Sequence, residues 1–550
     1  MEAQNVLKDP FPTSELTTLD FGSLDGRRDS LLEDSFVFTN SVKQFLQDRH
    51  SIIVGEMGAG KSALFELLKN NSDRLPTFKN KLVIPIHEAI SFQLLRKFVE
   101  EEFSGHDKKL IYKIIWKFQI LDRVCEEVSN LPDFPSSSEE REIKHFLETI
   151  KSREIDESVL GKFMGLLKKA QVRLKTEITG APISLEMGLN DSPSKNELNL
   201  DRVYKCVEKI SQRRASFNPL VIIDRIDTFV AGENYDTQRA FINALLEVDD
   251  DLHTSHPVIG RKIFLRSDLF ARLDYESLGY DKVNDNTLRV EWSEAELVWF
   301  IANRIMSAFK EVNLLNEAEV MLSSDLSEYH LSGFKILRLL PFIPRWVKKK
   351  CFNFALINQE RNQSLTDRLN KSIITKVFPH KVIHKDQTSE EVEIDLFRFI
   401  NTHFRDGHGK VLPRHLLTFL KQVANTSSKY YRNNPDQDVH AEEINGSWEW
   451  QLFKKRCIYE AYCDSKKEYI RNISRVENKW NNYFSVFIGK RGNKKTIDFN
   501  WVKTIVALDD QEVTDFLAYL NHIGFLYVSD AHPDPKRRKY KIPIIYMPSL

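Results

Sequence analysis

The stretch "SIIVGEMGAGKS" at residues 51–62 limits the possible folds of this 550-residue chain more than any other feature. An apolar run leads into a loop with the spacing G-x-x-x-x-G-K-S, and a segment with the apolar pattern of a helix follows. Glycine adopts backbone angles that a Cβ atom forbids, so a glycine-rich loop can turn successive N–H groups toward one point. The stretch therefore predicts a buried strand, a tight loop and a helix, which together form the first unit of an α/β sheet.

This loop has the chemistry of a triphosphate site. Lys61 would place an ammonium group near the β- and γ-phosphates, and Ser62 would offer its hydroxyl to Mg²⁺. The positive end of the following helix would lie at the same place. We expect ATP and Mg²⁺ as ligands, held by Gly55, Glu56, Met57, Gly58, Ala59, Gly60, Lys61, Ser62 and Ala63. The alternative is a chance match in a glycine-rich turn, and the apolar segments on both sides of the loop argue against it.

Three further apolar runs predict strands of the same sheet. They lie at residues 81–86, 218–224 and 262–268, and segments with helical periodicity separate them. Strands that alternate with helices predict a mostly parallel sheet with helices on both faces. Because 163 residues separate Lys61 from Asp224, the mostly helical stretch at about residues 88–200 must be an insertion into this α/β core.

Two acids end the run "LVIIDRID" at residues 220–227. Asp224 falls at the carboxyl tip of a predicted strand, where open α/β sheets place ligands, and would hold Mg²⁺ through a water molecule. Asp227 would polarise the water that attacks the γ-phosphate. The alternatives are a helix N-cap for Asp224, and a surface acid or arginine partner for Asp227. Many hydrolases of this type carry a glutamate where this chain has Arg225, so these residues argue for binding more strongly than for hydrolysis.

The predicted strand at residues 262–268 ends in two more polar candidates. Ser267 or Arg266 would reach the γ-phosphate from the neighbouring strand. An ordinary salt bridge is the alternative for Arg266. Both residues therefore join the list of candidate catalytic side chains.

Composition restricts the setting of the protein. Lys and Arg number 79, as do Asp and Glu, so the overall charge gives no argument for nucleic acid. The five cysteines form no C-x-x-C pair, which fits the reduced thiols of a cytosol. The N-terminus lacks the apolar core of a signal peptide, and the apolar runs are far shorter than the ~18 residues that a membrane helix needs. We expect a cytoplasmic protein without membrane contact.

The C-terminal segment at residues 502–547 predicts two helices followed by two strands, the order of a winged helix. Asp509 would cap the second helix, and Gly524 would end it. Residues 450–550 carry 18 Lys and Arg against 11 Asp and Glu. The basic residues gather in two places, at Lys536, Arg537, Arg538 and Lys539 and at Lys490, Arg491, Lys494 and Lys495. Such clusters can neutralise phosphates, so nucleic acid is a possible partner, but contact with protein or simple solvation stays open.

The stretches "IIVGEMGAGKSALF", "VIIDRID", "IFLRSDLF" and "LPRHLLTFL" together resemble bacterial P-loop ATPases of the AAA+/STAND type, similar in style to the KAP ATPases. The resemblance covers residues 36–310 well and the remainder loosely. KAP proteins carry an acid-acid-apolar-acid string where this chain has "DRID", so the middle acid is replaced. The resemblance implies a helical lid in which Pro413 starts a helix and Arg414 reaches the nucleotide. A capped surface helix is the alternative for Arg414, and Arg304 is a weaker candidate for the same role.

The resemblance also implies a domain order and a function. We expect an N-terminal arm at residues 1–38, an α/β P-loop NTPase core at 39–310, a helical lid region at 311–440 and a winged-helix-like domain at 441–550. The expected function is an ATP-driven molecular switch of bacterial conflict systems such as defence against phage, acting through a homo-oligomer or a separate effector protein. A DNA-engaging loader or translocase and a non-catalytic nucleotide-binding scaffold are the alternatives.

Overall fold

The described part of the chain divides into two compact units in the computed structural model. The sheet unit comprises Val42–Met57 and Leu64–Val290, and the helical unit comprises Met1–Ser41, Gly58–Ala63 and Glu291–Leu550. The structure describes residues 16, 18–86, 108–151, 171–174, 185–188, 200–214, 217–226, 235–274, 278–311, 367, 370–371, 373–375, 377–385, 391–434, 442–444, 447–449, 452–474 and 478–548. Asp227 lies outside these residues, as do residues 1–15 of the predicted arm, 88–107 of the predicted insertion and 312–366 of the predicted lid region.

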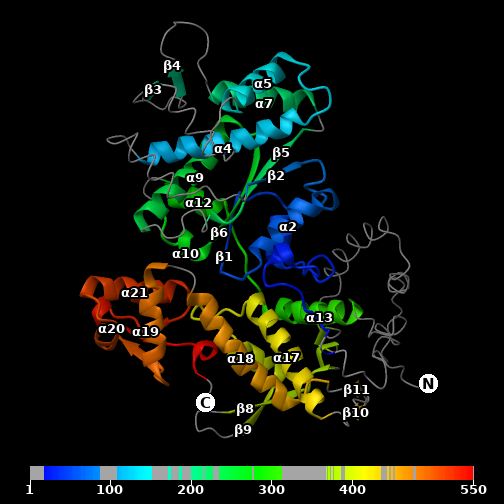
Figure 1. The fold of residues 1–550 in the computed structure, drawn as a ribbon, viewed down its shortest axis with the longest axis vertical. Coiled ribbons are helices and arrows are strands. Elements are labelled where there is room, and N and C mark those ends of the chain that lie inside the picture. Colours follow the sequence, from blue (N-terminus) through cyan, green and yellow to red (C-terminus); the bar gives the residue numbers. More distant parts are fainter. Residues whose placement is uncertain are drawn as a thin grey trace, which may run out of the picture. The chain divides into compact units, whose positions relative to one another are not determined.

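The sheet unit is an α/β structure with five parallel strands (Figure 1). The strands are β1 (Ile52–Gly55), β2 (Leu82–Ile86), β5 (Pro219–Ile223), β6 (Gly260–Arg266) and β7 (Thr287–Arg289), and their order is β2-β5-β6-β1-β7. The predicted parallel sheet is therefore confirmed, with four of its strands at the predicted places. The sequence did not predict β7, which is three residues long and buries only Leu288.

Both faces of this sheet are covered by apolar side chains. Phe264 of β6 contacts Phe45 of α1 (Asn40–Phe45) and Phe65 of α2 (Lys61–Asn71), with ring centroids 6.1 and 5.8 Å away. Its neighbours Ile263 and Leu265 belong to the separate core on the other side. Since successive side chains of a strand point to opposite faces, this alternation explains why the strands read as continuous apolar runs.

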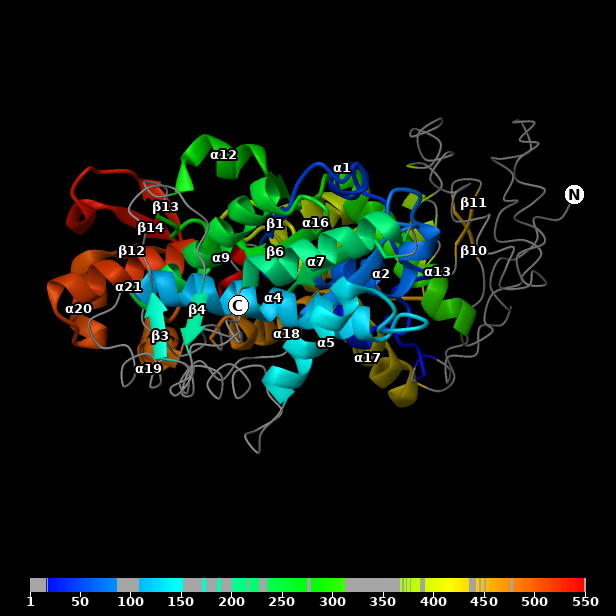
Figure 2. The same ribbon diagram turned by 90° about the horizontal axis from the view of Figure 1, so that it is seen from above.

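The described residues between β2 and β5 are mostly helical. They contain α4 (Lys108–Ser129), α5 (Ser138–Lys151) and α7 (Leu200–Arg213), and α4 lies alongside α7 (Figure 2). The Tyr204 hydroxyl of α7 donates to the Lys117 carbonyl at 2.7 Å, and the Trp116 indole of α4 donates to Phe241 of α9 (Tyr235–Ser255) at 3.1 Å. The same segment contains an antiparallel hairpin, in which β3 (Gln171–Leu174) pairs with β4 (Leu185–Gly188). The remaining short helical elements of the unit are η3 (Ser72–Arg74), α10 (Ser267–Phe270) and α12 (Tyr280–Asp285).

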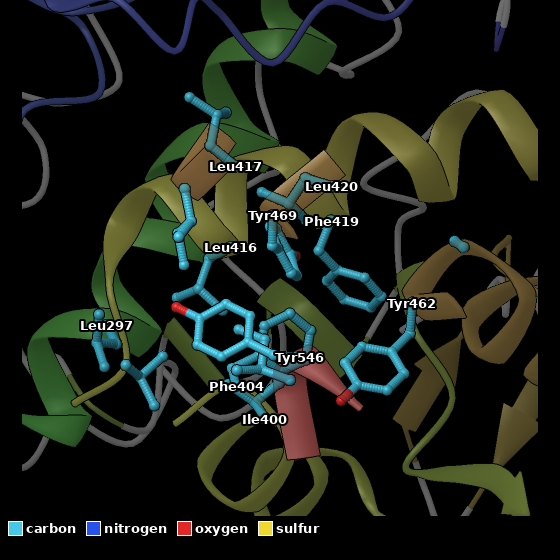
Figure 3. Close-up of a cluster of buried hydrophobic side chains, with 14 of the residues drawn as sticks. Leu297, Ile400, Phe404, Leu416, Leu417, Phe419, Leu420, Tyr462, Tyr469 and Tyr546 are labelled. Carbon is cyan, nitrogen blue, oxygen red and sulfur yellow. The ribbon is translucent and has the colours of Figure 1, made fainter. Parts of the chain in front are cut away.

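The helical unit packs around α17 (Pro413–Asn433) and α18 (Lys455–Ser474). Leu416 and Phe419 of α17 meet Tyr462 and Tyr469 of α18 in one apolar cluster, which also contains Phe404 (Figure 3). The Tyr469 hydroxyl donates to the His415 carbonyl at 2.6 Å. The other elements here are η2 (Gly26–Arg28), α13 (Glu294–Glu311), α16 (Leu396–His403) and the hairpins β8 (Lys381–Lys385) with β9 (Glu391–Asp395) and β10 (Glu442–Ile444) with β11 (Ser447–Glu449).

The C-terminal part of the helical unit contains the predicted order of two helices and two strands. These are α20 (Phe499–Val506), α21 (Asp510–His522), β13 (Tyr527–Asp530) and β14 (Lys539–Lys541), preceded by α19 (Asn481–Arg491) and β12 (Thr496–Asp498). The strands form an antiparallel sheet in the order β12-β14-β13. Asp509 caps α21 in a reciprocal capping box with Glu512, and Gly524 follows the helix with a φ of +72°. This C-terminal part also contains three short 3-10 helices, η6 (Asn478–Trp480), η7 (Pro535–Arg537) and η8 (Ile544–Tyr546).

No helix among the described residues combines the length and the apolar character that crossing a bilayer requires.

Candidate nucleotide-binding site

Three polar strand ends lie at the carboxyl edge of the parallel sheet. Gly55 at the end of β1 pairs with Arg266 at the end of β6, and β6 also pairs with β5, which Asp224 follows. The Asp224 N–H donates to the Ile86 carbonyl at 3.2 Å, which fixes the start of the turn after β5. Because β6 lies between β1 and β5, its tip stands between the start of the loop and Asp224. Open α/β sheets place their ligands at this edge.

The loop after β1 has the backbone that its glycines predict. Gly58 and Gly60 have φ values of +92° and +100°, which residues with a Cβ atom rarely adopt. Helix α2 begins at Lys61, directly after the loop, so its N-terminus lies at the end of the loop. The Lys61 side chain is buried. The geometry is that of a strand, a tight turn and a helix N-terminus, which together can bind an anion.

Trp292 supports the loop from the helical unit. Its indole N–H donates to the Ala59 carbonyl at 2.7 Å, and its ring would lie 3.8 Å from a Cβ atom placed on Gly60. The ring itself packs edge-on against Phe300 of α13, with centroids 5.8 Å apart. The bond turns the Ala59 carbonyl toward Trp292. Sequence reasoning missed Trp292, because no motif connects it to a loop more than 200 residues earlier.

The predicted lid arginine lies against the loop. A Cβ atom on Gly58 would stand 2.6 Å from the Cβ atom of Arg414 and 3.2 Å from its Cδ atom. Pro413 occupies the first turn of α17, as predicted, and Arg414 follows it. Gly58 is therefore required both by its φ value and by the space that Arg414 fills. The structure brings Arg414 to the loop, while its role toward a nucleotide stays a prediction.

The N-terminal arm also contacts the start of α2. A Cβ atom on Gly26 of η2 would lie 3.1 Å from the Ala63 nitrogen and 3.3 Å from the Ala63 Cα atom. The turn is held by Asp25, which accepts from the Arg27 N–H at 3.2 Å and from its guanidinium at 3.0 and 3.1 Å. Sequence reasoning predicted only an N-terminal arm at residues 1–38 and no contact of Gly26 with α2.

Asp224 is buried, with 5 % of its surface exposed, at the end of β5. The next residue, Arg225, has a φ of +64°. A residue with a side chain pays about 1–2 kcal/mol for this left-handed conformation, and such strain gathers at functional sites. The strained residue directly follows the buried Asp224, at the carboxyl edge of the sheet. Asp227 lies outside the described residues, so its predicted role has no structural counterpart here.

The side chain of Arg266 forms a salt bridge with Asp268. Its guanidinium donates to both oxygens of Asp268, at 2.9 and 2.7 Å, which is the salt bridge weighed as its alternative role. Ser267 is half-buried and forms the first residue of α10 at the carboxyl edge. Ser267 is therefore the better candidate of the two for contact with a ligand.

Arg304, the weaker candidate for the lid arginine, forms an ion pair with Asp29 of the N-terminal arm. It is buried and donates to both carboxylate oxygens of Asp29, at 2.9 and 2.5 Å, and to the Phe21 carbonyl at 3.2 Å. These bonds tie α13 to the N-terminal arm. We assign Arg304 to this contact rather than to a nucleotide.

Comparison with known proteins finds a distant likeness to a protein of Escherichia coli. No protein-family model matches this chain. Over 300 residues, 53% of its length, the chain is 22% identical to the "Putative transposon gamma-delta 80.3 kDa protein" of Escherichia coli (strain K12). The match spans 40% of that protein, so the chain corresponds to less than half of this relative.

Proposed function

We propose that this protein binds ATP with Mg²⁺ and hydrolyses it as a molecular switch, on a P-loop NTPase core of the AAA+/STAND type. The observation that carries the proposal is the loop at residues 55–62. It combines the G-x-x-x-x-G-K-S sequence with positive φ values at Gly58 and Gly60 and with a helix that begins at Lys61. It follows β1, whose end lies at the same sheet edge as Asp224.

The residues present fit this ligand. The glycine-rich turn would direct N–H groups at the phosphates, and Lys61 would add a positive charge beside them. Magnesium prefers one or two protein oxygen ligands together with phosphate oxygens and water. Ser62 and Asp224 supply a hydroxyl and a carboxylate of that kind. A bound Mg²⁺ would neutralise charge that develops on the phosphate oxygens.

A switch needs a path from the ligand to the rest of the protein, and the loop has one. Gly58–Ala63 belong by their contacts to the helical unit. Arg414 joins the loop to α17, Trp292 joins it to the segment before α13, and Gly26 joins it to the arm. A change in the loop on binding or hydrolysis would therefore act on three segments at once. Asp227 and Ser267 remain our candidates for orienting water and for contact with the γ-phosphate.

Binding is tested with a fluorescent ATP analogue and Mg²⁺ on the full chain. Lys61→Ala should weaken affinity at least tenfold, while Lys69→Ala, an exposed lysine of the same helix, should leave it unchanged. Phosphate release then separates the switch from a scaffold that only binds. Asp227→Asn should abolish release and keep affinity. Equal affinity in Lys61→Ala and the parent protein would refute the proposal.

We take assembly into a homo-oligomer, or binding of an effector protein, as the output of the switch. The supporting argument is the resemblance to ATPases of bacterial conflict systems, which also suggests anti-phage defence. Light scattering of the full chain with and without ATP and Mg²⁺ would detect nucleotide-dependent assembly. A constant mass in both states would leave the effector as the output.

A DNA-engaging ATPase is the second candidate. The winged-helix-like arrangement of α20, α21, β13 and β14 supports it, as do the exposed Lys490, Lys494 and Lys495. The distant relative carries the word transposon in its name. Lys536 supports it less, because it is held by Asp510 at 2.6 Å. ATPase activity that rises with duplex DNA and falls with salt would favour this function over the switch.

A further inference from the structure

Two cationic side chains are buried in the helical unit, away from the nucleotide loop. Lys466 of α18 is 7 % exposed, and Arg491 at the end of α19 is 4 % exposed. The two helices contact each other. Lysine and arginine are rarely buried to this degree unless an acid accompanies them.

Neither cation has an acidic partner among the described residues. No ion pair of Lys466 or Arg491 occurs there, and Arg491 Nε and Nη1 are buried without a hydrogen-bond partner. The adjacent Lys467 shows the ordinary case, since it is exposed and donates to Asp464 at 2.9 Å.

Aromatic rings replace acids around the two charges. Lys466 Nζ lies 4.8 Å from the centre of the Tyr462 ring, and the Arg491 guanidinium lies 5.6 Å from that of Phe525. Such contacts offset only part of the cost of removing a charge from water.

The pKa values of both groups reflect this environment. Burial lowers the pKa of Lys466 to about 8, the Cys463 thiol acts in the opposite direction, and the nearby positive charge of Arg491 lowers it further. Burial alone lowers the pKa of Arg491 to about 10. Because α18 and α19 contact each other, one anion bound by both side chains would offset two positive charges that no acid accompanies.

We propose that Lys466 and Arg491 form a binding site for one phosphate-type oxyanion, either a free phosphate group or a phosphodiester of a nucleic acid. Arginine offers a planar fork of donors to such a group, and lysine offers a compact charge. The exposed Lys490, Lys494 and Lys495 flank Arg491 in the sequence and would attract anions to this region. The site is independent of the nucleotide loop, so the proposal stands or falls separately from the proposed function.

Thermal unfolding of the full chain in inorganic phosphate tests the site, with sodium chloride of equal ionic strength as reference. Phosphate should raise the Tm of the parent protein with the logarithm of its concentration. In a Lys61→Ala background, which removes phosphate binding at the nucleotide loop, the rise should be lost in Lys466→Met and in Arg491→Met, and kept in the control Lys467→Met. Without phosphate, both buried-site variants should unfold at the same or a higher temperature than the parent, because they remove an uncompensated charge.

Duplex DNA distinguishes the two sources of the oxyanion. If Arg491→Met weakens DNA binding and reduces the slope of log affinity against log salt by about one, the anion is a backbone phosphate. If DNA binding is unchanged while the phosphate response is lost, the anion is a free phosphate group. An equal rise in Tm with phosphate in the parent and in both Met variants would overturn the proposal. Should either Met variant fail to fold, Arg491→Lys keeps the charge and should keep the phosphate response.

Discussion

Replacing Gly58 by alanine tests the contact between the loop and α17 most directly. The φ of Gly58 is +92°, and such a backbone conformation destabilises an L-residue by about 1–2 kcal/mol. The new methyl would also stand 2.6 Å from the Arg414 Cβ atom. That atom is fixed to the first turn of α17, so it cannot swing away as the end of a side chain can. Overpacking of this kind costs about 1–3 kcal/mol more.

Gly409 provides a matched control for the backbone part of this cost. Its φ is +72°, and a Cβ atom placed on it would meet no heavy atom within 4 Å. Gly409→Ala should therefore lower the free energy of unfolding by only about 1–2 kcal/mol. Gly58→Ala should lower it by about 2–5 kcal/mol in total. Urea denaturation followed by circular dichroism measures both.

A double-mutant cycle isolates the contact itself. Arg414→Gly removes the Cβ atom that the new methyl would strike, so the double variant should recover about 1–3 kcal/mol relative to the sum of the single effects. The same variants titrated with a fluorescent ATP analogue show whether the displaced loop still binds. Equal costs for Gly58→Ala and Gly409→Ala, or a cycle without coupling, would refute the placement of Arg414 over the loop.

Three further predictions concern single side chains. Trp292→Phe keeps an aromatic ring but removes the donor to the Ala59 carbonyl, a hydrogen bond that contributes about 0.5–1.5 kcal/mol. The Kd for the ATP analogue should therefore rise about two- to tenfold. An unchanged Kd would show that Trp292 does not shape the loop. Arg225→Gly should be more stable than Arg225→Ala by about 1 kcal/mol in urea, because only glycine relieves the strain at a φ of +64°; equal stabilities would mean that the strain is absent. Burial, together with the nearby His384 charge, lowers the pKa of His403 to about 4, and burial beside Arg414 lowers that of His415 to about 3. The unfolded chain binds these protons near pH 6.5 and the folded chain does not, so stability should be full above that pH and should fall as the pH drops toward 4. His415→Gln should flatten the profile of Tm against pH between 7 and 5, and a parallel profile in the variant would contradict this.

The strands of the sheet could be predicted because burial on both faces leaves a clear trace in the sequence. The strands β1, β2 and β5 are continuous apolar runs, β6 contains the apolar run Ile263–Leu265, and Asp224 was placed correctly because it follows the run of β5. The strand β7 left no such trace, since Thr287 and Arg289 flank its one buried residue. Its place beside β1 depends on hydrogen bonds across the sheet, and local residue type does not record them.

The neighbours of the loop could be predicted only in part. Arg414 was identified through a resemblance, while its distance from Gly58 depends on how α17 packs against its own core. Trp292 and Gly26 carried no signal, because a tryptophan before a helix and a glycine in a turn are common in any fold. The positive φ of Arg225 was also unforeseen, since arginine has no preference for that conformation.

Dissection of the protein into fragments would need to respect where the loop makes its contacts. Gly58–Ala63 are continuous in sequence with β1 and α2, yet their neighbours come from the arm and from residues beyond 290. A fragment cut at residues 42 and 290 would keep every strand of the parallel sheet and lose Gly26, Trp292 and Arg414 together. The nucleotide affinity of such a fragment would be that of the loop without these three contacts. A low affinity of the fragment would therefore not imply a low affinity of the intact chain.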